Sequence, residues 1–200
     1  MFPKTIIIMI RKISIAFIAF LSCFCFSAKA IRIEYEGVYY DVDTVKWEAS
    51  VSNHPDYYKG SVVIPETIVY NDMNYVVTTV GLHAFYKCVD LGSVPLLNSI
   101  LTIKSAAFDS CINLKTIEFP KNLDVIEFGA FRNSGLTSVE LANNLRMIKD
   151  QVFKGCKDLE QVTISSPNLY IELRVFESCE SLVEYKVEGD SEHYSSYDGI

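Results

Sequence analysis

The sequence predicts a repeat solenoid, in which short units stack and each contributes a strand to one parallel β-sheet. Three observations support this: an Ala-Phe or Val-Phe pair recurs five times, a leucine follows each pair by five or six residues, and an apolar-x-apolar segment follows each leucine. Such a unit cannot bury its own apolar face, so the copies must stack. With 50% apolar and 22% charged residues in a chain of 200, enough material for a core is present.

Residues 1–30 have the pattern of a secretory signal peptide. An apolar run over 13–28 follows two basic residues and precedes a small-x-small site that ends at Ala30. The run is shorter than the roughly twenty residues that a membrane-spanning helix needs. We expect cleavage after Ala30, secretion, and no membrane span in the mature chain. An uncleaved anchor and a lipid anchor on Cys23 are the alternatives, although Phe20 and Leu21 fit a lipobox poorly.

Residues 31–75 are expected to form an N-terminal β cap. Aromatic and β-branched residues alternate there, and Glu36-Gly37 and Asn71-Asp72 are turn signals. The segment 62–65, Val-Val-Ile-Pro, mimics the strand of a repeat. A cap of this kind would cover the apolar edge that the first repeat leaves open.

Residues 76–189 hold about five repeats of 22–23 residues. The phenylalanines are Phe85, Phe108, Phe131, Phe153 and Phe176, and the leucines are Leu91, Leu114, Leu136, Leu159 and Leu182. Five residues before each phenylalanine stand Val80, Ile103, Ile126, Ile148 and Ile171. The third repeat lacks one residue between Ser134 and Leu136, where Gly135 can accommodate a tighter turn. Residues 190–200 look like an incomplete further repeat or tail, and we expect a truncated chain.

Each repeat is expected to contain one strand and one turn. The segments after the leucines alternate with period two, as a half-buried strand does. The Ala-Phe-x-x-Cys segment predicts a short helical or 3-10 turn, because that turn places Phe and Cys on one face. Stacked in register, these units would give a curved solenoid with the strands on its concave face.

These residues resemble the BspA-like leucine-rich repeat, whose consensus is Ile-Gly-x-x-Ala-Phe-x-x-Cys-x-x-Leu-x-x-Ile-x-Ile-Pro. The segment from Ala107 to Pro120 matches it well, and the likeness extends over 31–188. The resemblance implies a leucine-rich-repeat solenoid from a bacterial surface or secreted protein. It also implies adhesion to host or matrix proteins, such as fibronectin and fibrinogen. The consensus describes the core, so it assigns no binding residue.

Four cysteines of the mature chain occupy one repeat position, three residues after the phenylalanine: Cys88, Cys111, Cys156 and Cys179. Stacked neighbours would lie roughly 5 Å apart, which permits disulfides in an oxidising compartment. The alternative is that each thiol fills space beside a phenylalanine. Ser134 occupies the same position in the third repeat, which favours the filler interpretation. Their spacing does not match a metal site.

No constellation in the sequence predicts catalysis or a cofactor. His54, His83 and His193 are scattered, and no glycine motif that cradles phosphate is present. Without the four basic residues of 1–30, the chain has 14 basic against 25 acidic residues, a net charge of −11. Such a surface disfavours nucleic acid as a partner. We therefore expect a protein that is not an enzyme and binds no metal.

The outward residues of the predicted strands form a candidate ligand-facing surface. Its members are Thr116, Glu118, Ser138, Glu140, Gln161, Thr163, Glu184 and Lys186. Glu118 and Glu140 fall on neighbouring strands, which indicates either hydrated carboxylates or a complementary cation. The predicted function is protein binding of the adhesion type. A carbohydrate-binding module is the first alternative, disfavoured because these columns are small or acidic rather than aromatic. A structural envelope spacer is the second.

Overall fold

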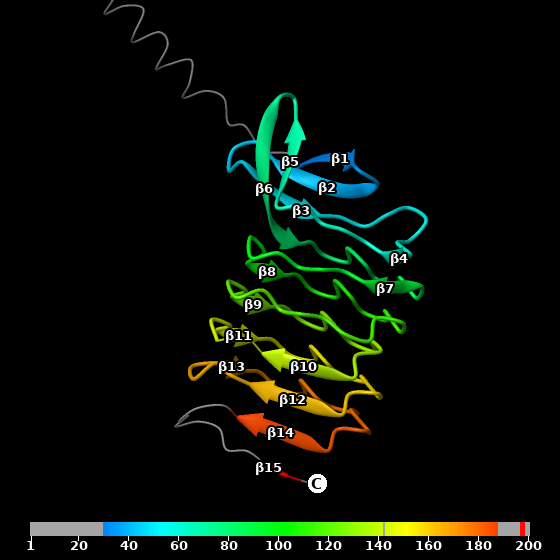
Figure 1. Cartoon of the computed structure of the whole chain (residues 1–200), viewed down its shortest axis with the longest axis vertical. Helices are drawn as coiled ribbons and strands as arrows, with labels where there is room; N and C mark the ends of the chain where they lie inside the picture. Colours follow the sequence, from blue (N-terminus) through cyan, green and yellow to red (C-terminus); the bar gives the residue numbers. More distant parts are fainter. Residues whose placement is uncertain (1–29, 142, 188–196, 199–200) are drawn as a thin grey trace, which may run out of the picture.

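The protein is a stack of coils that runs from an N-terminal β region to the coil of β14 (Figure 1). The computed structural model describes residues 30–141, 143–187 and 197–198. The predicted signal peptide with Cys23 therefore lies outside the described residues, as does the predicted tail apart from 197–198. Each coil in the repeat region takes 22 or 23 residues, as the paired positions of neighbouring strands show.

The N-terminal strands continue directly into the solenoid. Strands β1 (Ile31–Tyr35), β2 (Val38–Asp43) and β3 (Glu48–Val51) form an antiparallel meander. β3 then pairs in parallel with β6 (Met73–Val80), and β6 pairs in parallel with the first short strand of the repeats. The predicted cap boundary at residue 75 falls inside β6. The first repeat is therefore covered by a sheet that belongs to both parts.

The end of the N-terminal region imitates a repeat. Tyr58 is buried and its ring lies 4.9 Å from that of Phe85. Strand β4 (Gly60–Ser61) pairs in parallel with β7 (Leu91–Ser93). Val62 and Ile64 are buried while Val63 is 70% exposed, which is the alternation expected for residues 62–65. A hairpin of β5 (Thr67–Tyr70) and β6 projects beyond this coil (Figure 1).

One face of the stack is a parallel sheet of two-residue strands, which we call the short-strand sheet. It consists of β8 (Thr102–Ile103), β9 (Val125–Ile126), β11 (Met147–Ile148) and β13 (Tyr170–Ile171). All four pair in register. The isoleucines that recur five residues before the phenylalanines lie in these strands, and Ile103, Ile126 and Ile148 have no exposed surface. Strand pairing at these positions was not predicted, because two residues are too few for a visible alternation.

The opposite face carries the predicted strands, which we call the long-strand sheet. It consists of β10 (Ser138–Leu141), β12 (Gln161–Ile164) and β14 (Glu184–Val187), paired in parallel and in register. Strand β15 (Tyr197–Asp198) pairs antiparallel with β14. The expected strand is thus present in the last three repeats. In the second repeat, residues 116–119 are not a strand.

The expected helical or 3-10 turn is wrong: the described residues contain no helix, and two successive β-turns take its place. Ala84 and Tyr86 donate their N–H groups three residues back, to Gly81 and His83. Between them, Phe85 donates to Ala107 of the next coil, at 2.7 Å. A helix cannot form when alternate N–H groups bond a neighbouring coil. Each repeat has two residues with positive φ, four positions apart, where the chain reverses: His83 and Lys87, Ala106 and Ser110, Gly129 and Asn133, Gln151 and Gly155, and Arg174 and Ser178.

A column of aromatic rings runs through the core between the two faces. The successive ring centroids of Phe85, Phe108, Phe131, Phe153 and Phe176 lie 4.9, 4.9, 5.6 and 5.5 Å apart. The ring planes are within 16° of parallel. The first four rings are completely buried. The repeats therefore stack in register, as the sequence predicted, with one phenylalanine ring above the next.

Candidate functional site

The long-strand sheet arranges the predicted surface residues in two columns. Register places Ser138, Gln161 and Glu184 in one column and Glu140, Thr163 and Lys186 in the other. Ser138, Glu140, Gln161 and Lys186 are exposed, and Thr163 and Glu184 are half-buried. The Gln161 amide Nε2 donates to Glu184 Oε2 at 2.8 Å, along the first column. The face is therefore polar and its side chains are held at the spacing of the coils.

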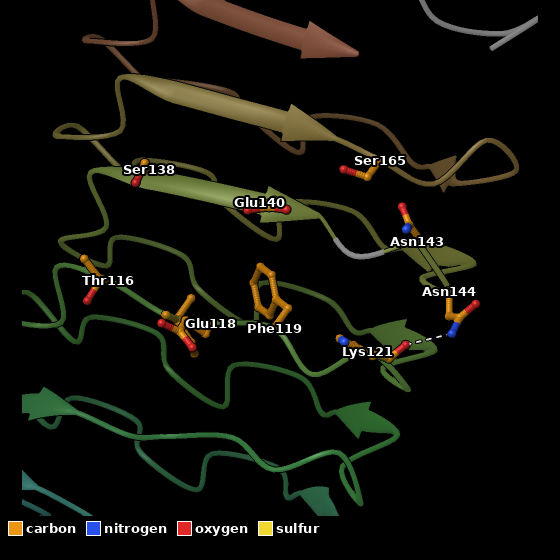
Figure 2. A pocket seen from close by; sticks show the side chains of 10 residues that line it. Thr116, Glu118, Phe119, Lys121, Ser138, Glu140, Asn143, Asn144 and Ser165 are labelled. Carbon is orange, nitrogen blue, oxygen red and sulfur yellow. Dashed lines mark hydrogen bonds between the residues drawn. The ribbon is translucent and has the colours of Figure 1, made fainter. Parts of the chain in front are cut away.

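Thr116 and Glu118, the other two predicted residues, are exposed on the coil beside β10. Together with Ser138 and Glu140 they line a hollow of about 710 Å³ (Figure 2). Its lining also includes residues that were not predicted: Ile117, Phe119, Lys121, Asn143, Asn144 and Ser165. The structure thus gathers half of the predicted surface at one border of the long-strand sheet, where loops from three coils meet.

The hollow lies where the sheet ladder is interrupted. Thr137 donates its N–H to Lys115 at 3.0 Å, but beyond this bond no backbone hydrogen bond joins described residues 116–119 to β10. Pro120 directly follows the interrupted segment, and Pro95 lies in the preceding repeat. Proline has no N–H to contribute to a ladder, and it is therefore confined to breaks and edges of sheets. Neither proline can donate an N–H to a strand ladder on this face.

Phe119 stands in the hollow between Glu118 and Glu140 (Figure 2). The period-two alternation of the segment places Phe119 on the inward side, but it is only partly buried, with its ring 5.6 Å from that of Phe131 at 72°. The corresponding Leu141 and Ile164 are buried. A planar ring is larger than these aliphatic side chains and meets the aromatic column edge-on, so it remains at the surface. Pro120, which alternation would have placed outward, is buried.

The charges at the hollow are uncompensated by neighbouring coils. Among the described residues, neither Glu118 nor Glu140 takes part in an ion pair, and Lys121 of the lining has no acidic partner within 4 Å. Several acidic residues elsewhere are paired across coils; Asp150, for example, binds Arg174 at 2.5 Å. The two carboxylates of the hollow therefore lie outside the ion pairs that join described residues on other parts of the surface.

Comparison with known families explains the repeat pattern. The model of the BspA type leucine rich repeat region matches residues 78–197 as six copies. This chain belongs to that family. The sequence indicated about five repeats over 76–189, so the family match extends the repeat region slightly at its C-terminal end. The curated proteins contain no match to the chain.

Solved structures of leucine-rich repeat proteins share the fold. A leucine rich cell surface protein from Faecalibacterium prausnitzii superposes with a TM-score of 0.68 and 23% identity, over 80% of this chain and 40% of that one. The pneumococcal vaccine antigen PcpA gives 0.64 and 23%, over 87% and 54%. The T. pallidum leucine-rich repeat protein TpLRR gives 0.60 and 26%, over 79% and 84%. This BspA-type chain therefore spans about half or less of the first two relatives.

The cysteine position of the BspA-type repeat holds four buried free thiols. Cys111, Cys156 and Cys179 donate their S–H groups to the carbonyl oxygens of Phe85, Phe131 and Phe153 at 3.0–3.1 Å. Ser134 occupies the same place and lies 3.3 Å from Cys156 Sγ. These contacts support the interpretation of the cysteines as core residues over the disulfide alternative.

In the part of the chain that the structure describes, the histidines and acidic residues do not gather into a metal site. His54 packs its ring 5.2 Å from those of Tyr39 and Tyr58, and its Nδ1 accepts a hydrogen bond from the Asp56 N–H. His193 lies outside the described residues. The described part of the chain contains no group of three or more His, Cys, Asp or Glu side chains that could hold a metal ion. Nor does any helix in that part have the length and apolarity to span a membrane.

Proposed function

We propose that this chain is a non-catalytic recognition module, secreted or held at the cell surface, that binds a host or extracellular-matrix protein through the long-strand sheet. The observation that carries the proposal is the pair of polar columns on a sheet whose opposite side is anchored by the phenylalanine column. The family relationship supports it, because a relative of this fold is a cell surface protein.

The face suits a protein partner because its side chains are fixed in position before binding. Neighbouring strands are paired at four successive residues, and the Gln161–Glu184 bond restrains two side chains further. Pre-ordered side chains lose less conformational freedom on association, which favours affinity. The net charge of −11 for residues 31–200 favours a partner with a basic surface.

The test is binding of the purified protein to immobilised fibronectin and fibrinogen by surface plasmon resonance. Thr163 lies at the centre of the face, between Glu140 and Lys186. A bulky side chain there, in Thr163→Tyr, should obstruct contact and weaken binding about tenfold or more. Thr67→Tyr is the matched control, because Thr67 is an exposed strand residue on β5, outside the long-strand sheet.

Loss of binding in Thr163→Tyr with normal binding in Thr67→Tyr supports the proposal. Equal binding by both variants would place the interface elsewhere on the solenoid. Failure of the unaltered protein to bind any matrix or plasma protein would favour the envelope-spacer alternative.

A further inference from the structure

We propose that the hollow beside Phe119 is a binding site for a neutral saccharide. This is a second binding function, and it does not depend on protein binding by the long-strand sheet. Its volume of about 710 Å³ is that of an ordinary small-ligand site, for which about 300–1,000 Å³ is typical.

The polar groups of the hollow match the hydroxyl groups of a sugar. A sugar hydroxyl both donates and accepts, so it needs partners of both kinds. Carboxylates accept, amides offer both functions on one planar group, and hydroxyls of serine and threonine do either. The hollow combines all three types: Glu118 and Glu140, Asn143 and Asn144, and Thr116 and Ser138.

Phe119 supplies the apolar surface that such a site also requires. A pyranose ring has a face of C–H groups, and these pack favourably against an aromatic ring. The residues at this position in the five repeats are Leu96, Phe119, Leu141, Ile164 and Val187, so only the second repeat has an aromatic one. The edge-on contact with Phe131, at 5.6 Å, fixes the Phe119 ring while leaving it partly exposed to the hollow.

The rim of the hollow is tied together across coils. Asn144 Nδ2 donates to the Lys121 carbonyl oxygen at 2.9 Å, as Figure 2 shows. One coil earlier, Asn122 Nδ2 donates to the Asn98 carbonyl oxygen, also at 2.9 Å. Asn98 Oδ1 accepts the N–H of Lys121 at 3.0 Å. The amide of Asn144 is therefore oriented before a ligand arrives, which reduces the entropy lost on binding.

The charge of the hollow selects against acidic sugars. Glu118 and Glu140 give it two negative charges against one positive charge on Lys121. Sialylated, sulfated or uronic sugars would bring a further anion to this place, which like-charge repulsion disfavours. A neutral hexose or N-acetylhexosamine meets no such barrier.

The test is a titration followed by ¹⁵N–¹H correlation spectra of the full protein. The probes are lactose, maltose, cellobiose and N,N′-diacetylchitobiose at millimolar concentrations, with 3′-sialyllactose as the acidic counterpart of lactose. We expect at least one neutral disaccharide to shift the amide signals of residues 116–119 and 143–144. The sialylated probe should bind more weakly than lactose.

Phe119→Leu removes the aromatic ring but leaves an aliphatic side chain like those that other repeats have at this position. It should weaken binding about three- to tenfold, which corresponds to the energy of an aromatic contact. Phe128→Leu is the control, because Phe128 is 42% exposed and outside the hollow. Its saccharide binding should equal that of the unaltered protein.

The saccharide site is refuted if no neutral probe shifts these amides, or if Phe119→Leu binds as tightly as Phe128→Leu. Stronger binding of sialyllactose than of lactose also contradicts it. Shifts at the same amides with a lysine-rich peptide and none with any sugar would assign the hollow to a protein ligand. Thr163→Tyr should retain sugar binding, so failure of the sheet interface and failure of the saccharide site are distinguishable.

Discussion

The cysteine position shows how a single residue type serves the stack. Each S–H of Cys111, Cys156 and Cys179 bonds a phenylalanine carbonyl of the preceding coil. The thiol is thus both a small apolar side chain and a weak donor between coils. Burial raises the pKa of Cys156 to about 12 and that of Cys179 to about 11. Burial also raises the pKa of Cys88 and of Cys111.

We therefore expect the four core cysteines to resist alkylation by iodoacetamide at pH 8 in the native protein. Alkylation requires the thiolate, which the raised pKa disfavours, and burial also keeps the reagent away from the sulfur. Mass spectrometry of the peptides containing Cys88, Cys111, Cys156 and Cys179 should show modification only after unfolding in urea. Rapid labelling of the native protein would contradict this, as would a Cys88–Cys111 or Cys156–Cys179 disulfide in a non-reduced digest.

The buried residues of the core could be predicted from the sequence, but only some of the residues that line the hollow could. Repeated positions such as Phe131 and Leu136 are set by one short period, so their burial could be predicted from the sequence. The outward placement of Glu118 and Glu140 followed from alternation in the same way. Asn143 and Asn144 could not be assigned to the hollow, because they reach it from a loop of the following coil. The exposure of Phe119 depends on its fit against Phe131, which spacing alone does not reveal.

At the scale of elements, the turn that follows each short strand is formed partly by hydrogen bonds to the next coil, and it is not an independent helix. Its side-chain spacing of i and i+3 is shared by a helical turn and by two consecutive β-turns, so the sequence could not separate them. The deciding factor is where the N–H groups bond: Phe131 donates to Val152 of the next coil at 2.9 Å. Inter-coil bonds of this kind depend on the stacked structure as a whole.

The third repeat is shortened at a place where two coils approach closely. Gly135 donates its N–H to the Cys111 carbonyl oxygen at 3.1 Å. A Cβ on Gly135 would lie 2.0 Å from the Ile112 carbonyl oxygen, well inside contact distance. The sequence indicated a tight turn here, and the structure shows that the requirement for glycine is the approach of a neighbouring backbone.

Gly135→Ala should accordingly lower the free energy of unfolding by about 1–3 kcal/mol, because the backbone of one coil must shift to admit the methyl group. Gly92→Ala is the control, since its Cβ would meet its nearest atom at 3.4 Å and the residue is exposed. Urea denaturation followed by circular dichroism measures both. Equal stability of the two variants would show that the coils can separate at Gly135 without cost.

At the scale of the whole molecule, neighbouring coils are joined by ion pairs as well as by strands and rings. Asp109 is buried and accepts from Arg132 at 2.6 Å, one coil away. Asp124 and Arg146 form a comparable but exposed pair. Exposed pairs each contribute little, at about 0–1 kcal/mol. The main links between coils are therefore the backbone ladders and the aromatic column, each of which connects a coil only to its two neighbours.

This nearest-neighbour arrangement predicts how a core defect spreads. Phe131→Ala should lower the free energy of unfolding by about 3–5 kcal/mol, because the ring is completely buried. That ring contacts both Phe108 and Phe153, at 4.9 and 5.6 Å. Hydrogen exchange should therefore accelerate first in the second, third and fourth repeats.

The amides of β1 and β2 should keep their protection longer in Phe131→Ala, because several coils separate them from the cavity (Figure 1). Phe128→Ala provides the control: its side chain is 42% exposed, and it should leave both stability and exchange nearly unchanged. Uniform acceleration across the chain in Phe131→Ala would show that the N-terminal strands and the repeats unfold as one cooperative unit. If exchange rises only around the third repeat, the stacked rings do not pass the loss of stability on to the neighbouring repeats.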